Sequence, residues 1–247
     1  NPSWIEMLLL VVAIVVSAIA FWRRFGKVVA IIRASKKDET WHWGDVAQRV
    51  RTFVWEVLLQ AKVIAQRPLP GITHAFVFWG FCAFALVTLN HFANGFGVHL
   101  LSPGSFFGRF YFALAAIFAV MVSVSILYLA FRRFVLRPRW LGKISPESGI
   151  IAALIFTLMW TYLVDYVNMT SGAADASPRW VWWLHSLSIL VFLPLVPHTK
   201  HLHLILSPAA VFLKRDGFSK IPPLVGDEDF GLDTGKDVTQ ILSLQAF

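Results

Sequence analysis

Residues 72–92 have the sequence ITHAFVFWGFCAFALVTLNHF, which contains no Asp, Glu, Lys or Arg. At about 1.5 Å of rise per residue, a helix of this length crosses the roughly 30 Å hydrocarbon core of a bilayer. The stretch therefore predicts a transmembrane helix that carries one imidazole near each end, His74 and His91. Four other stretches have the length and apolar character of a span: 4–22, 110–131, 149–167 and 180–203.

The composition agrees with a membrane protein. Of the 247 residues, 57% are apolar and 15% are charged, and the mean hydropathy is +0.65. A soluble domain typically has roughly 45–50% apolar and about 25% charged residues. These values exclude a disordered chain and argue against a soluble enzyme. With Cys82 as its single cysteine, the chain cannot form an internal disulfide framework, a cysteine-ligated zinc site or an iron–sulfur cluster.

The basic residues predict the orientation of the spans. The chain has 22 Lys and Arg against 14 Asp and Glu. All but Arg109 and Arg179 fall in segments 23–71, 132–146 and 200–247, which alternate with the other connections. By the positive-inside rule these segments face the cytoplasm. We therefore predict an all-α integral membrane bundle of five transmembrane helices, with its N-terminus outside and its C-terminus inside. The net charge of +8 is explained by orientation and anionic lipid, not by nucleic acid.

Two further segments lie outside the spans. Residues 45–66 alternate apolar and basic positions with helical periodicity, which predicts an amphipathic helix on the inner membrane surface between spans one and two. We place the five-span membrane domain at 1–206. Residues 207–247 are richer in proline, glycine and acidic residues and are expected to form an extended cytoplasmic tail.

Histidine is the residue type that suggests chemistry, because ionisable groups inside a membrane are costly. Spans two and five run in opposite directions, so His74 and His203 are expected at the same inner depth. His91 and His185 are likewise expected at the same outer depth. Two antiparallel helices with an imidazole at each of two matched depths can hold two stacked haems, each iron between two axial histidines.

The helical spacing refines this expectation. His185 and His203 are 18 residues apart, or five turns, and share one face of a continuous helix. His201 and His198 would point about 160° and 140° away from that face. On span two, the 17 residues from His74 to His91 leave a rotation of about 100°, which weakens the outer pair unless helix tilt absorbs it.

Each of these residues can also be explained without a bound haem. His74 and His203 can be interfacial side chains that reach headgroups, and His91 can lie at a solvated boundary. His99 is expected in solvent and His42 at the inner interface. His198, which follows a proline, is open to a role with a propionate or a quinone. Asp165, with Tyr166 and Asn168, is open to proton relay, although a carboxylate so close to the surface can simply be hydrated.

Two short motifs resemble a known family. His185-Ser186, followed by TKHLHLILSP at residues 199–208, is similar to the fifth span of the membrane cytochrome b (gamma) subunit of respiratory nitrate reductase. The segment THAFVFWGF at residues 73–81 is more similar still to heterodisulfide-reductase-like membrane iron–sulfur oxidoreductases, some of which pass electrons from electron-transfer flavoprotein to menaquinone.

The resemblance implies a five-helix cytochrome b domain of a bacterial or archaeal cytoplasmic membrane, with b-type haem ligated from spans two and five. His74 and His203 match the inner ligands and His185 an outer ligand, and His201 of the same motif is counted with the cofactor-binding residues. His91 departs from the nitrate reductase pattern, whose second span-two histidine falls at Phe84 here.

In fused relatives, a cysteine-rich ferredoxin-like domain follows the last span. The resemblance therefore implies that any iron–sulfur cluster belongs to a partner or to a missing C-terminal domain, and the apolar end LSLQAF (242–247) favours the missing domain.

Together, these features predict a dihaem cytochrome b that moves electrons between a membrane quinone, by resemblance menaquinone, and a cytoplasmic iron–sulfur or electron-transfer flavoprotein partner. Two alternatives remain open: a proton-coupled transporter that uses the histidines with Asp165, and a cofactor-free membrane anchor of a larger complex. A transporter predicts discontinuous helices and paired short segments in the two halves, which the sequence does not show.

Overall fold

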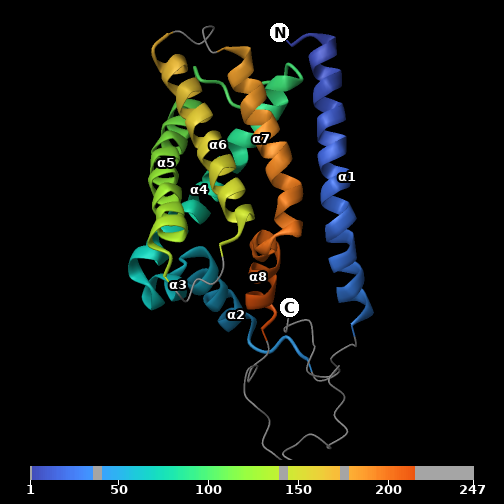
Figure 1. The fold of residues 1–247 in the computed structure, drawn as a ribbon, viewed down its shortest axis with the longest axis vertical. Coiled ribbons are helices and arrows are strands. Elements are labelled where there is room, and N and C mark those ends of the chain that lie inside the picture. Colours follow the sequence, from blue (N-terminus) through green and yellow to red (C-terminus); the bar gives the residue numbers. More distant parts are fainter. Residues whose placement is uncertain (1, 36–40, 139–143, 173–177, 215–247) are drawn as a thin grey trace, which may run out of the picture.

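The computed structural model describes residues 2–35, 41–138, 144–172 and 178–214, and every regular element in these ranges is a helix (Figure 1). Residues 215–247 of the predicted tail lie outside the described residues. The elements are α1 (Trp4–Ala34), α2 (Val46–Phe53), η1 (Val54–Leu58), α3 (Ala61–Gln66), α4 (Pro68–Gly95), α5 (Phe106–Phe131), η2 (Arg132–Leu136), α6 (Pro146–Thr170), α7 (Arg179–His198), η5 (Lys200–Leu202) and α8 (His203–Phe212).

Five helices are long and apolar enough to cross a membrane, as the sequence predicts: α1, α4, α5 with η2, α6 and α7. They pack in the order α4, α5, α6, α7 and α1, with α4 crossing behind the others (Figure 1). The starts of α1 and α7 and the end of α4 lie at one end of the bundle, and α2, α3 and α8 lie at the other. We call these the outer and inner ends, after the predicted orientation.

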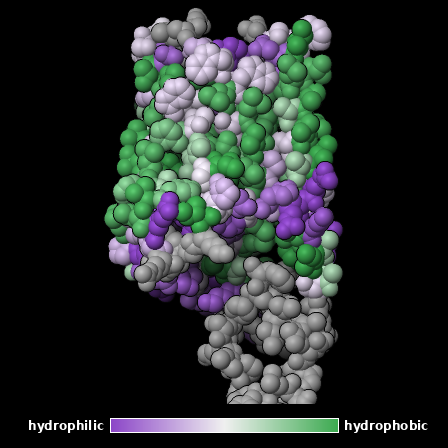
Figure 2. Space-filling model, viewed as in Figure 1, coloured by the Kyte–Doolittle hydropathy of each residue, from purple (hydrophilic) through white to green (hydrophobic). Residues whose placement is uncertain are grey.

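The surface has the layering of a membrane protein. A broad apolar belt covers the middle of the visible face, and polar residues gather toward both ends (Figure 2). Large apolar side chains stay exposed on every spanning helix, for example Val16, Phe81, Val124, Phe156 and Val191. In lipid such side chains need no protein partner.

The core is built mainly between α4, α5 and α6. Small residues on α5, Ala115 and Ala119, are almost fully buried, which allows close approach of the neighbouring helices. The phenol of Tyr162 on α6 donates to the carbonyl of Phe112 at 2.8 Å, and Tyr111 donates to the carbonyl of Ala83 at 2.7 Å. These bonds supply buried polar groups with partners where water is absent.

The first and fifth spans differ from their predicted bounds. Helix α1 continues beyond 22 to Ala34, because nothing in its basic second half interrupts a helix. Helix α7 ends at His198 and not at 203, because Pro194 and Pro197 lack the amide hydrogen that a helix needs. Thr199 is extended, and its hydroxyl accepts from the amide of His201 to begin η5. Residues 207–212, which were expected in an extended tail, are the second half of α8.

The predicted amphipathic helix over 45–66 is not continuous. It forms α2, the π-helical η1 and α3, with a break at Gln60, whose φ of 53° is left-handed. The side-chain amide of Gln60 donates to the carbonyl of Val57 at 2.7 Å, and Trp79 of α4 donates to the carbonyl of Leu58 at 2.7 Å. These side chains therefore satisfy carbonyls around the break. The placement of this segment on a membrane surface stays a prediction.

Candidate functional site

The inner histidines come together from two helices. His74 lies two turns into α4 and His203 begins α8, and their ring centroids are 6.2 Å apart with an interplanar angle of 34°. They meet because the chain breaks at Thr199 and restarts, which places His203 at the inner end without a continuous helix from His185. The shared-face argument from the 18-residue spacing of His185 and His203 therefore does not apply. The rings of His74 and His203, which the matched-depth argument paired, do lie side by side.

The hydrogen bonds of this pair leave ring nitrogens that can ligate a metal. The Nδ1–H of His203 donates to the carbonyl of Lys200 at 2.8 Å, which fixes the tautomer and leaves the lone pair on Nε2. In His74, the buried Nδ1 has no hydrogen-bond partner among the described residues. The hydroxyl of Thr73, the residue before His74, donates to the carbonyls of Leu69 and Pro70 in its own helix.

His201 lies beside this pair. Its ring centroid is 6.1 Å from that of His203, and its Nδ1 is 2.9 Å from the hydroxyl of Thr199. Burial, followed by the electrostatic influence of the neighbouring His203 and Lys200, lowers the pKa of His201 to about 4. The imidazole of His201 is therefore neutral at pH 7 and adds no charge beside His203.

The outer histidines also come together, and more closely. The rings of His91 on α4 and His185 on α7 are 4.5 Å apart. The Nε2 of His91 is 2.9 Å from the hydroxyl of Ser186, and the Nδ1 of His185 is 2.7 Å from the hydroxyl of Thr161. Each hydroxyl also donates to a backbone carbonyl in its own helix, so its oxygen can accept a hydrogen bond from the histidine.

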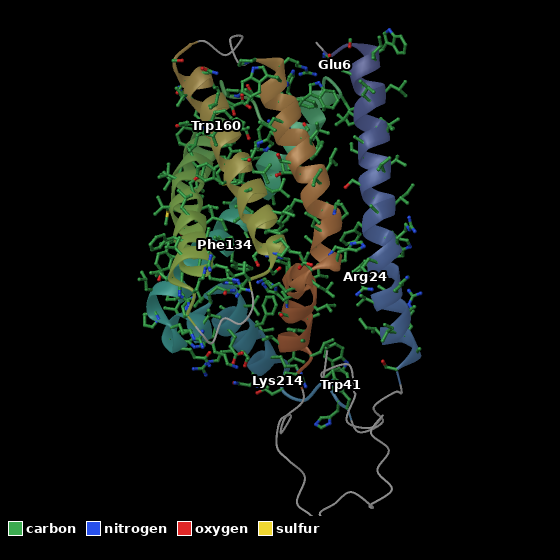
Figure 3. All side chains as sticks on the ribbon, viewed as in Figure 1. Glu6, Arg24, Trp41, Phe134, Trp160 and Lys214 are labelled. Atoms are coloured by element: carbon green, nitrogen blue, oxygen red, sulfur yellow. The ribbon has the colours of Figure 1, made fainter. Side chains whose placement is uncertain are left out.

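Side chains at the outer end cover this pair. Trp182 stacks on His91 with centroids 4.9 Å apart and planes 18° from parallel, and the Arg179 guanidinium lies over Trp182 at 4.4 Å. Arg179 also forms a 2.7 Å ion pair with Glu6 at the start of α1, near the outer end in Figure 3. A Cβ atom at Gly95 would lie 2.8 Å from the Trp182 ring, so glycine leaves the space that Trp182 occupies.

The remaining predicted polar residues lie elsewhere. The Nδ1–H of His198 donates to the carbonyl of Pro194 at 2.8 Å, which closes the end of α7, and His99 bonds to Asn94 at 2.7 Å in an exposed turn. His42 is in the segment before α2, away from both pairs in sequence. The sequence reasoning missed Thr161 and Trp182, because a threonine and a tryptophan in apolar spans are common and their partners lie on other helices.

The two pairs differ in how they fit an iron. Two imidazoles that ligate one metal from opposite sides, with metal–nitrogen bonds of about 2 Å, have ring centroids about 6 Å apart. The inner pair fits this spacing. The rings of the outer pair are closer than this, at 4.5 Å, and the Nε2 of His91 is 2.9 Å from the Ser186 hydroxyl. Across the described ranges no cluster of three or more His, Cys, Asp or Glu is arranged for a metal ion, but a haem needs only two axial residues.

Comparison with known proteins identifies two distant relatives. The chain is 24% identical over 243 residues to the EtfAB:quinone oxidoreductase of Syntrophomonas wolfei, covering 83% of this chain and 32% of that protein. It is 25% identical over 189 residues to the probable iron-sulfur-binding oxidoreductase FadF of Bacillus subtilis, covering 66% of this chain and 26% of that protein. Both relatives are oxidoreductases by name.

The similarity supports a redox function for a membrane protein of this kind. The chain spans about a third of the length of the first relative and about a quarter of the second. No family model matches the chain, and no solved structure matches it.

Proposed function

We propose that this chain is the haem b membrane part of a quinone-linked oxidoreductase. In this proposal it passes single electrons between a membrane quinone, by resemblance menaquinone, and a cytoplasmic iron–sulfur or electron-transfer flavoprotein partner. The 6.2 Å separation of the His74 and His203 rings carries the proposal. The relatives support its coarser part, because their names contain quinone, Etf and iron–sulfur.

The protein's own residues would hold and tune the cofactor. A bound haem b supplies a reversible one-electron couple, and axial ligands and their hydrogen bonds set its potential. The Nδ1–H of His203 is held by the Lys200 carbonyl, which leaves its Nε2 free to ligate, and His74 would provide the second imidazole from a separate helix. Neutral imidazoles ligate iron without adding a buried charge.

The orientation and location complete the proposal. The inner pair lies at the end of the bundle where the predicted cytoplasmic segments gather, so an electron partner in the cytoplasm would approach the haem from that side. We accordingly propose a multi-pass protein of a bacterial or archaeal cytoplasmic membrane, with membrane lipid around the five spans.

We include one haem in this proposal. The sequence predicts a second haem between His91 and His185, and we leave it out of the proposal because their 4.5 Å separation is shorter than the roughly 6 Å of two imidazoles on one iron. Those residues form instead a hydrogen-bonded cluster with Ser186 and Thr161.

The haem-to-protein ratio of purified wild-type chain and of the His91→Ala variant tests this assignment. We expect about one haem per chain in both, because the proposal gives His91 no role in ligating iron. A wild-type ratio of two that falls in His91→Ala would show that the outer pair binds haem and would overturn the single-haem assignment. A wild-type ratio of zero would overturn the proposed function and favour the transporter or the cofactor-free anchor.

A further inference from the structure

A proline inside α7 leaves one carbonyl without its helical partner. The amide of residue 194 would normally donate to the carbonyl of Leu190, but Pro194 has no amide hydrogen and its ring presses against that carbonyl. Leu190 is buried, at 8% exposure, and no water is available inside a bilayer. This carbonyl needs a donor from elsewhere in the protein.

Ser17 of α1 provides the donor. Its hydroxyl donates to the Leu190 carbonyl at 2.6 Å, and Ser17 is only 5% exposed. Between residues 7 and 21 of α1, Ser17 is the only side chain that can form a hydrogen bond. Apart from Ser17, the buried position of α1 is Leu10, so most of this helix faces outward. The bond is therefore a specific attachment of α1 to the proline site in α7.

The attachment lies just before the point where the chain redirects toward the inner pair. Two turns after Leu190 the helix ends at His198, Thr199 is extended, and His203 begins α8 below α7 (Figure 1). A change in the bend at 190–194 would move His203 relative to His74, because His74 is on a separate helix. A proline inside a helix bends it because its ring clashes with the carbonyl four residues earlier, so the position of the Leu190 carbonyl bears directly on this bend.

We propose that Ser17 is a positioning residue: by binding the Leu190 carbonyl it fixes the bend of α7 at Pro194 and thereby the distance from His203 to His74. The effect on the haem rests on the proposed function, whereas the hydrogen bond itself does not. Ser17 does not touch the imidazoles, so its influence passes through the backbone of α7.

A double-mutant cycle separates this bond from general packing. Thermal unfolding is measured on the full chain in detergent for wild type, Ser17→Ala, Pro194→Ala and the double variant. Ser17→Ala is expected to lower the unfolding midpoint by about 4 °C, because it leaves a buried carbonyl unsatisfied. In the Pro194→Ala background, the new amide of residue 194 can donate to the Leu190 carbonyl. There we expect Ser17→Ala to lower the unfolding midpoint by less than half as much as it does in the wild-type background. Equal costs in both backgrounds would overturn the attachment.

The haem signature separates a positioning role from a purely structural one. In Ser17→Ala we expect a shift of the haem midpoint potential and of its low-spin electron paramagnetic resonance signal, with recovery in Ser17→Thr, which keeps the hydroxyl. Ser188→Ala is the matched control, because among the described residues that buried serine bonds to Leu184 within α7 and to no other helix.

An unchanged signature in Ser17→Ala, despite coupling in the unfolding cycle, would overturn the positioning role. A wild-type protein without haem would overturn both the proposed function and the positioning role, and the unfolding cycle would still decide whether the hydrogen bond joins α1 to the proline site.

Discussion

Replacing His203 with alanine is expected to remove the haem absorbance of the purified protein. His203 and His74 approach each other from different helices, with ring centroids 6.2 Å apart. Loss of one axial imidazole should lower haem retention by more than about tenfold, since even partners of metal ligands change affinity by 10–100-fold. The absorbance ratio of haem to protein measures this loss, and His74→Ala should give the same result.

His201→Ala is the matched control for this substitution. His201 is on the same segment, two residues from His203, and its ring is 6.1 Å from that of His203. It is held by the hydroxyl of Thr199 and is not paired across the helices. We expect His201→Ala to retain haem. Loss of haem in His201→Ala together with retention in His203→Ala would show that His201, and not His203, ligates the haem.

Gly71→Ala is expected to destabilise the inner end of the bundle. A Cβ atom at Gly71 would lie 2.5 Å from the carbonyl oxygen of Val63 and 2.7 Å from the Cα of Ile64. Both obstacles are backbone atoms of α3, so they cannot rotate away, and overpacking of this kind costs about 1–3 kcal/mol. For a protein of this size we expect the unfolding midpoint to fall by roughly 5 °C.

The haem should report the same substitution, because His74 follows Gly71 by one turn of α4. Displacement of α3 from α4 would move His74, so Gly71→Ala should also lower haem occupancy. Gly104→Ala is the control: the nearest atom to its Cβ is the Ser102 hydroxyl at 3.6 Å, and we expect no loss of stability. An unchanged midpoint in Gly71→Ala would show that α3 does not pack as described.

The five spans were predictable because a run of about 20 apolar residues has few stable structures other than a membrane-spanning helix. The depth argument also selected the ring pairs that lie together in the structure, His74 with His203 and His91 with His185. The rotation of about 100° expected on span two did not keep His91 from His185. Helix α4 crosses the bundle obliquely (Figure 1), so rings that point in different directions along it can each face a partner.

The other features of the fold and the site depend on contacts between helices, which the sequence does not show. The sequence contains Pro194 and Pro197 and still predicts a continuous span to 203. Proline weakens a helix without fixing the residue at which it ends, so the extended Thr199 and the restart at His203 could not be placed from the sequence. The break at Gln60 likewise has no glycine or proline to mark it. Thr161 and Trp182 became part of the outer cluster only when α6, α7 and α4 were placed together.

Reduction of the purified wild-type protein by a menaquinol analogue in lipid vesicles tests the central claim most directly. The measurement is the reduced-minus-oxidised absorbance spectrum during addition of the quinol. The account predicts the alpha and Soret bands of a b-type haem, about one per chain, appearing as the quinol is oxidised. A protein with no such bands, or with a haem that dithionite reduces and the quinol does not, would contradict it.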